Sequence, residues 1–61
     1  MYEKYAKKRD ELGLTDYRVA KMTGLSRSVF SDWKRGKSKP KVDKLQLIAK
    51  ALKVKIEYLL A

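Results

Sequence analysis

Residues 24–40, GLSRSVFSDWKRGKSKP, concentrate side chains that can recognise a ligand through hydrogen bonds and charge. Hydroxyl, carboxylate and guanidinium groups all donate or accept hydrogen bonds. The segment carries such groups on Ser26, Arg27, Ser28, Ser31 and Asp32. Between residues 34 and 41 there are five cations and no acid, namely Lys34, Arg35, Lys37, Lys39 and Lys41. This chemistry suits the binding of a polar anion, yet the only Phe and the only Trp of the chain, Phe30 and Trp33, lie within the same stretch.

The composition favours a polyanionic partner and gives little support to catalysis. Sixteen Lys and Arg against seven Asp and Glu give a formal charge of +9 on 61 residues, which is typical of chains that bind a polyanion. Without Cys or His, the chain has no disulfide, no thiolate nucleophile and no imidazole base or metal ligand. The acids are scattered and do not form a calcium-loop pattern. We therefore expect no enzyme activity, no metal site and no cofactor.

The length and the apolar runs predict one small domain, residues 1–61, with no membrane partner. No apolar run is long enough to span a bilayer, and the charged first dozen residues lack the apolar core of a signal peptide. We expect a reduced, cytoplasmic setting, with no evident small-molecule ligand.

Three glycines and one proline divide the chain into short pieces in which apolar residues recur three or four residues apart. This period favours helices, and no sustained alternation indicates strands. The expected fold class is therefore all-α, with five short helices packed around a compact core. The expected helices are Tyr2–Leu12, Asp16–Thr23, Arg27–Arg35, Val42–Leu52 and Ile56–Leu60.

Glycines and hydroxyl residues mark the ends of the first three helices. Gly13, Gly24 and Gly36 are expected as C-terminal caps, because glycine adopts the left-handed backbone conformation easily. Thr15 and Ser26 are expected to cap the second and third helices with their hydroxyl groups. Residues 36–40 then form a basic loop.

The second and third helices are joined by a very short turn. Such helices must cross closely, which requires a small residue where the backbones approach and a glycine where the chain reverses. Ala20 and Gly24 meet these requirements. Tyr58 and Leu60 could each join the core or form part of a dimer surface. The other expected core residues are Tyr2, Tyr5, Ala6, Leu12, Val19, Leu25, Phe30, Trp33, Val42, Leu45, Ile48, Ala49, Leu52, Ile56 and Leu59.

The order and spacing of these features resemble the helix-turn-helix family of Cro and lambda-type phage repressors. The resemblance covers nearly the whole chain and implies a five-helix, lambda-repressor-like fold whose helix-turn-helix is formed by the second and third helices. The structural residues of that motif would be Ala20, Gly24, Ser26, Phe30 and Trp33. The matching segments are Gly13-Leu14-Thr15, Val19-Ala20, residues 23–28, Trp33-x-Arg35-Gly36-Lys37, Pro40, residues 48–54 and residues 56–60.

The resemblance implies that the third helix lies in the DNA major groove while the second crosses the backbone. If Phe30 and Trp33 point inward, the rotation of 100° per residue turns the polar residues outward. The implied base-reading residues are Arg27, Ser28, Ser31 and Asp32. An Arg can contact O6 and N7 of guanine together, and an Asp can accept from the amino group of cytosine. Arg27 could instead reach a phosphate, and the two serines could be merely solvated.

Phosphate contacts are expected on both sides of this helix. The amides at the start of the second helix, together with the Thr15 hydroxyl, form an anion site of the kind common at helix N-termini. Tyr17 could contact a phosphate or nothing, and the loop lysines could be only solvated. The expected phosphate-binding residues are Thr15, Asp16, Tyr17, Arg18, Arg35, Lys37, Lys39 and Lys41.

Three positions depart from the family pattern. Lys8 stands where the family usually has Leu, which leaves the core of the first helix to Tyr5, Leu12 and the aliphatic stem of Lys8. Lys34 stands where the family commonly has a Glu that pairs with the Arg of the first helix, so Arg9 lacks its expected partner and could turn to phosphate, to Asp10 or to another acid. Asp16 stands where Gln is frequent, which places an acid close to an expected phosphate.

These features lead to the hypothesis of a sequence-specific double-stranded DNA-binding regulator of transcription. It would be a phage or bacterial repressor that binds a palindromic operator as a homodimer, with half-sites about 34 Å apart. An alternative hypothesis is the antitoxin of a toxin-antitoxin pair, which binds both DNA and a partner protein. A basic module on anionic membranes fits less well, because the aromatic residues are expected in the core.

Overall fold

Five α-helices follow one another in the structure, a computed structural model that describes residues 1–60. The expected all-α class is confirmed, and α2, α4 and α5 have the expected bounds. Helices α1 and α3 end one residue earlier than expected, because Leu12 and Arg35 are C-cap residues just outside them. The helices are α1 (Tyr2–Glu11), α2 (Asp16–Thr23), α3 (Arg27–Lys34), α4 (Val42–Leu52) and α5 (Ile56–Leu60).

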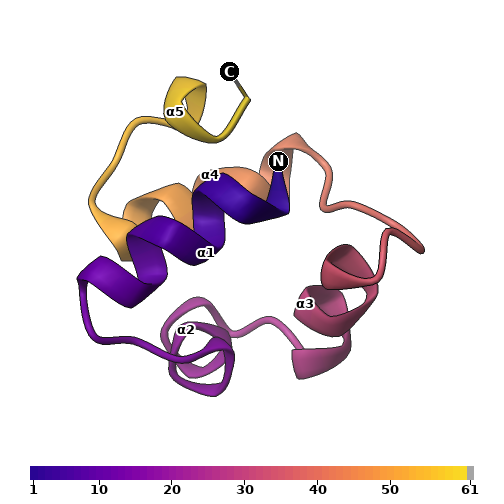
Figure 1. Cartoon of the computed structure of the whole chain (residues 1–61). Helices are drawn as coiled ribbons and strands as arrows, with labels where there is room; N and C mark the ends of the chain where they lie inside the picture. The colour runs from indigo at the N-terminus through magenta and orange to yellow at the C-terminus, as the bar shows by residue number, and fades with distance from the viewer. Residues whose placement is uncertain (61) are drawn as a thin grey trace.

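Helix α4 packs in the middle of the fold, against α2 on one side and α5 on the other (Figure 1). Helix α1 also contacts α5, and α2 contacts α3. Ten buried apolar residues form one cluster to which every helix contributes. They are Tyr5, Val19, Ala20, Phe30, Trp33, Leu45, Ile48, Ala49, Leu52 and Leu59.

The turn between α2 and α3 has the geometry that its sequence predicts. Gly24 has φ 78°, in the left-handed region, and its N–H donates to the carbonyl of Ala20. The Thr23 hydroxyl donates to the carbonyl of Val19 (2.9 Å) and accepts from the N–H of Leu25 (3.3 Å). The polar groups of this turn thus find hydrogen-bond partners within the turn itself. The turn places α3 directly beside α2. Gly13 and Gly36 also have the expected positive φ.

The expected burial of two apolar residues was wrong. Leu12 and Val42 are 44% and 56% exposed, and Leu60, which could have joined the core, is 51% exposed. Leu12 lies beyond the end of α1, and the other two lie at the first residue of α4 and the last of α5. A helical period marks a face of a helix but not how far the core extends along it, so terminal residues on the correct face can remain in solvent.

Candidate nucleic-acid interface

The inner face of α3 is fixed by aromatic packing. Phe30 and Trp33 are buried, and both stack against Tyr5 of α1 with ring centroids 5.5 and 5.0 Å apart. The rings of Tyr2 and Trp33 are nearly perpendicular, with their centroids 5.4 Å apart. A fully buried Phe contributes about 1.5–3 kcal/mol, and each such aromatic pair adds about 0.5–1.5 kcal/mol. The two aromatic residues of the polar segment therefore set the rotation of α3 about its axis.

The outer face of α3 carries the polar residues. Arg27, Ser28 and Ser31 are exposed, and Asp32 is half-buried on the flank of the helix. The Ser31 hydroxyl donates to the carbonyl of Arg27 at 3.4 Å, one turn back along the helix. The structure therefore brings three of the expected base-reading side chains onto one solvent-facing surface with the fourth at its edge, while their contact with bases stays a prediction.

Ser26 occupies the N-cap position of α3, but its hydroxyl does not cap the helix as expected. Its backbone has the extended conformation of a cap residue, while its Oγ lies 2.9 Å from Oγ of Ser28 instead of bonding to a backbone N–H. The two hydroxyls satisfy each other, which competes with capping. The first backbone N–H groups of α3 consequently have no side-chain acceptor.

Asp32 connects α3 to the basic loop. Its carboxylate accepts a hydrogen bond from Nη2 of Arg35 at 3.3 Å, an i,i+3 pair on the helix. Its backbone carbonyl accepts from the N–H groups of Lys37 (2.9 Å) and Ser38 (3.4 Å). The direction of the loop is therefore set by the last turn of α3.

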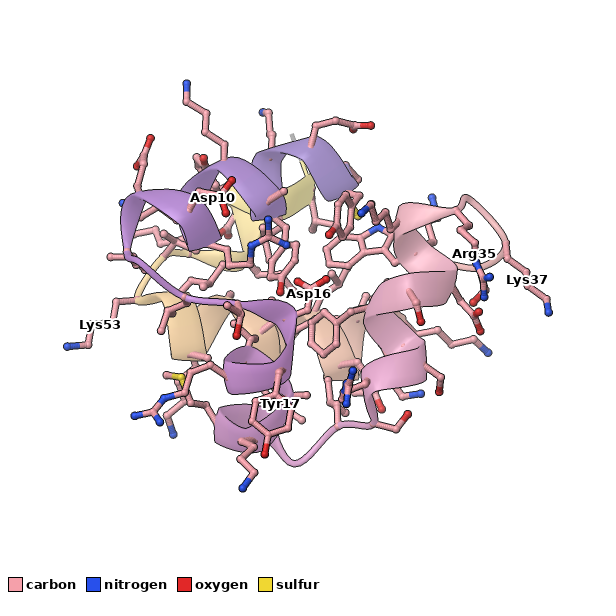
Figure 2. All side chains as sticks on the ribbon, turned by 60° about the horizontal axis from the view of Figure 1, so that its bottom comes forward. Asp10, Asp16, Tyr17, Arg35, Lys37 and Lys53 are labelled. Atoms are coloured by element: carbon pink, nitrogen blue, oxygen red, sulfur yellow. The ribbon has the colours of Figure 1, made fainter. Side chains whose placement is uncertain are left out.

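The basic loop extends the cationic surface beyond α3. Lys37, Lys39 and Lys41 are exposed, and none of them is within salt-bridge distance of an acid in residues 1–60. Figure 2 shows Arg35 and Lys37 pointing outward at the end of α3. A groove of about 400 Å³ lies between α3, this loop and the start of α4. It is lined in part by Ser28, Asp32, Lys39, Lys41 and Lys44, so it brings predicted base-reading and phosphate-binding residues together.

The start of α2 divides its side chains between the surface and the interior. The Thr15 hydroxyl accepts from the N–H of Arg18 at 3.1 Å, which confirms Thr15 as the cap of α2 and leaves the hydroxyl proton free to donate. Thr15, Tyr17 and Arg18 are exposed. The carboxylate of Asp16 instead turns toward α1 (Figure 2). Only the backbone N–H of Asp16, and not its side chain, therefore lies where a phosphate is expected.

Asp16 is the centre of a polar network between α1 and α2. Its Oδ1 accepts from Tyr5 Oη at 2.6 Å and from Arg9 Nη1 at 2.7 Å, and its Oδ2 accepts from Tyr2 Oη at 3.1 Å. Burial alone would raise the pKa of Asp16, but the hydrogen bonds from Tyr5, Arg9 and Tyr2 outweigh it and hold that pKa below its ordinary value. Burial, together with the hydrogen bond to the carboxylate, raises the pKa of Tyr5.

The network identifies the partners of Arg9. Besides Asp16, the guanidinium of Arg9 contacts Oδ1 of Asp10 at 2.8 Å. Lys34 is exposed and makes no salt bridge with any described residue. The departures at positions 34 and 16 are thus linked, because the acid absent from position 34 is replaced by the acid at position 16. The sequence indicated this exchange through two residues whose charges are unusual for the family, Lys34 and Asp16.

One pair of contacts was missed by sequence reasoning. The ring of Tyr17 lies near two cations, with Lys21 Nζ 5.4 Å and Arg27 Cζ 5.5 Å from its centroid. The spacing of Tyr17 and Lys21, four residues apart on α2, could have predicted the first contact. The second depends on how α2 and α3 cross.

Comparison with known proteins agrees with this architecture. A family model for the helix-turn-helix matches residues 6–59. Searches of curated proteins and of solved structures found no match. None of the five described helices combines the length and apolar character that a membrane span needs. Because the family model covers most of the sequence, the chain belongs to the DNA-binding helix-turn-helix family of the Cro and lambda-repressor type.

Proposed function

We propose that this DNA-binding helix-turn-helix regulator is a phage or bacterial repressor that reads a specific duplex sequence with α3. The observation that carries this function is the division of α3 into two faces. Phe30 and Trp33 anchor one face in the core, while Arg27, Ser28 and Ser31 lie exposed on the other. Short polar side chains allow a helix to approach base edges closely, and Arg27 can contact guanine through two hydrogen bonds.

Phosphate contacts on both sides of α3 would fix its register on DNA. On one side are the free Thr15 hydroxyl proton and Arg18 at the start of α2, and on the other are Lys37, Lys39 and Lys41. If four to six phosphates are neutralised per subunit, a plot of log K against log salt has a slope of about −4 to −5 per subunit. Asp32, which pairs with Arg35 in the free protein, penalises registers that bring its carboxylate near phosphate.

A homodimer on a palindromic operator is the arrangement we propose for binding. Two copies of α3 in successive major grooves would be about 34 Å apart, one helical turn of DNA. Occupied operators would block RNA polymerase, and the site of action would be the nucleoid in the bacterial cytoplasm. The formal charge of +9 supports rapid association with DNA.

Selection of bound duplexes from a random pool tests this function. A random region of about 30 base pairs spans roughly three helical turns and accommodates two half-sites. We expect enrichment of a palindrome whose half-sites are centred about 10 base pairs apart. Enrichment of an asymmetric site would contradict the dimer, and recovery of a pool with no preferred sequence would contradict specific recognition.

A further inference from the structure

We infer that Tyr17 is a positioning residue that holds the guanidinium of Arg27 in place for base reading. This role rests on the proposed reading of DNA by α3. Tyr17 is the second residue of α2 and Arg27 is the first residue of α3. Cζ of Arg27 lies 5.5 Å from the centroid of the Tyr17 ring, which is within the range of a cation–π interaction. The contact therefore joins the two helices of the motif at the end of α3 that is expected to enter the groove.

Tyr17 and Arg27 also line the same hollow of the surface. A shallow hollow of about 220 Å³ lies between α2 and α3, and its lining residues are Tyr17, Ala20, Lys21, Gly24, Leu25 and Arg27. Ala20 and Gly24 are small, so among the lining residues of the turn only Leu25 has a large side chain. Figure 2 shows Tyr17 at the surface of α2, where it is 51% exposed.

Arg27 has no competing acidic partner in the part of the chain that the structure describes. Arg9 pairs with Asp10 and Asp16, and Arg35 pairs with Asp32, whereas no carboxylate lies within salt-bridge distance of Arg27. A carboxylate would accept hydrogen bonds from the same N–H groups that must donate to a base. An aromatic ring attracts the guanidinium through its face and leaves its in-plane N–H groups free for a bidentate contact. Tyr17 can therefore restrict Arg27 without blocking it.

Lys21 makes the ring a shared anchor for two cations. Its Nζ lies 5.4 Å from the same centroid, and the electron-rich face of the ring offsets part of the repulsion between the two positive groups. A long, exposed Arg side chain otherwise samples many rotamers, and ordering them upon binding weakens the contact with DNA. The ring restricts the rotamers of Arg27 before DNA binds, so fewer of them have to be ordered on binding.

Two substitutions separate the ring of Tyr17 from its hydroxyl group. Tyr17→Phe keeps the aromatic face, and Tyr17→Leu removes it. Met22→Ala is the matched control, because Met22 lies on the same helix with nearly equal exposure, 50%, but does not line the hollow. Since Tyr17 is half exposed, all three variants are expected to fold, which circular dichroism checks.

The first measurement is made without DNA, on the full chain by NMR. The ring current of Tyr17 should shift the side-chain proton resonances of Arg27 in the wild type and in Tyr17→Phe. The shift should disappear in Tyr17→Leu and persist in Met22→Ala. Arg27 resonances that are the same in the wild type and Tyr17→Leu would overturn the assignment, whatever the protein does with DNA.

The second measurement is discrimination between base pairs at the position where Arg27→Ala relaxes preference. Tyr17→Leu should lower this discrimination about 2- to 5-fold, the equivalent of a cation–π interaction at an exposed site, while Tyr17→Phe and Met22→Ala keep it. In the Arg27→Ala background, Tyr17→Leu should have no further effect on this discrimination.

Unchanged discrimination in Tyr17→Leu would overturn only the role of Tyr17, whereas a wild type that binds no duplex would overturn the proposed function as well. An equal loss in Tyr17→Phe would assign the effect to the hydroxyl and overturn the ring contact.

Discussion

Arg9 of α1 and Asp16 of α2 form an ion pair of 2.7 Å that joins the first helix to the helix-turn-helix motif. Their side chains are only 17% and 30% exposed, and two tyrosine hydroxyls donate to the same carboxylate. Such a pair is less screened by water than an ordinary surface salt bridge. The carboxylate lies at the N-terminus of α2, where negative charge also interacts favourably with the helix dipole.

Replacing Asp16 by Asn should lower the free energy of unfolding by about 2 kcal/mol, because Arg9 and both tyrosines lose a charged acceptor. Urea denaturation at pH 7 measures this change. Asp10→Asn is the matched control, since Asp10 also contacts Arg9 at 2.8 Å but is largely exposed, and it should cost less than about 1 kcal/mol. Equal effects of the two substitutions would contradict the central place of Asp16.

The stability of the protein should fall in acid through the same carboxylate. The pKa of Asp16 is lower in the folded chain than its ordinary value, so its contribution is fully present above about pH 4 and is lost as the pH falls through the folded pKa. Urea titrations between pH 7 and pH 2 should show the difference between wild type and Asp16→Asn narrowing below about pH 4. A difference that stays constant over this range would contradict the depressed pKa.

The sequence predicted most of the backbone because its signals are local. Gly24 and Thr15 act within one turn of their own positions, and the helical period correctly placed Phe30 and Trp33 in the core. The partner of Arg9 could not be predicted in this way, because it depends on how α1 packs against the start of α2. The same holds for the contact of Tyr17 with Arg27. Ser26 does not cap α3 with its side chain, because its hydroxyl is hydrogen-bonded to the hydroxyl of Ser28 instead.

Replacing Arg27 by Ala should relax the preference at one base pair per half-site and cost about 1–3 kcal/mol on the selected duplex. Competition binding on the selected and single-substituted duplexes measures both effects. Arg18→Ala is the comparison, because a lost phosphate contact should weaken binding to all sequences alike. If Arg27→Ala weakens binding to selected and random DNA equally, Arg27 does not read a base.

Replacing Lys39 by Ala should weaken binding to every duplex and make the salt slope shallower by about one unit per subunit. Affinities measured at several salt concentrations give the slope. Figure 2 shows Lys53 on the side of the molecule away from Arg35 and Lys37, so Lys53→Gly removes an equal charge outside the expected interface. An unchanged slope for Lys39→Ala would mean that this lysine is only solvated.

Lys53→Gly should also stabilise the fold. Lys53 is the C-cap residue that follows α4, with φ 59° and ψ 40°, and it is the one non-glycine residue with positive φ in residues 1–60. The left-handed conformation costs an L-residue about 1–2 kcal/mol, while the greater freedom of glycine in the unfolded chain offsets about 0.4–1 kcal/mol. We expect a net gain of about 0.5–1 kcal/mol, visible as a higher Tm by circular dichroism. A lower Tm would indicate that the Lys53 side chain stabilises the fold in another way.

Within the described residues, no side-chain hydrogen bond or salt bridge links α3 to another helix. The ion pair of Arg9 joins α1 to α2 and does not reach α3. Helix α3 is held by Phe30 and Trp33 through aromatic packing. We therefore expect that its outer positions can be exchanged for those of another helix-turn-helix protein if Tyr17 of α2, whose ring contacts Arg27, is exchanged with them. Such a graft would transfer operator preference between scaffolds, and the chain offers a starting point for engineered DNA-binding proteins of only 61 residues.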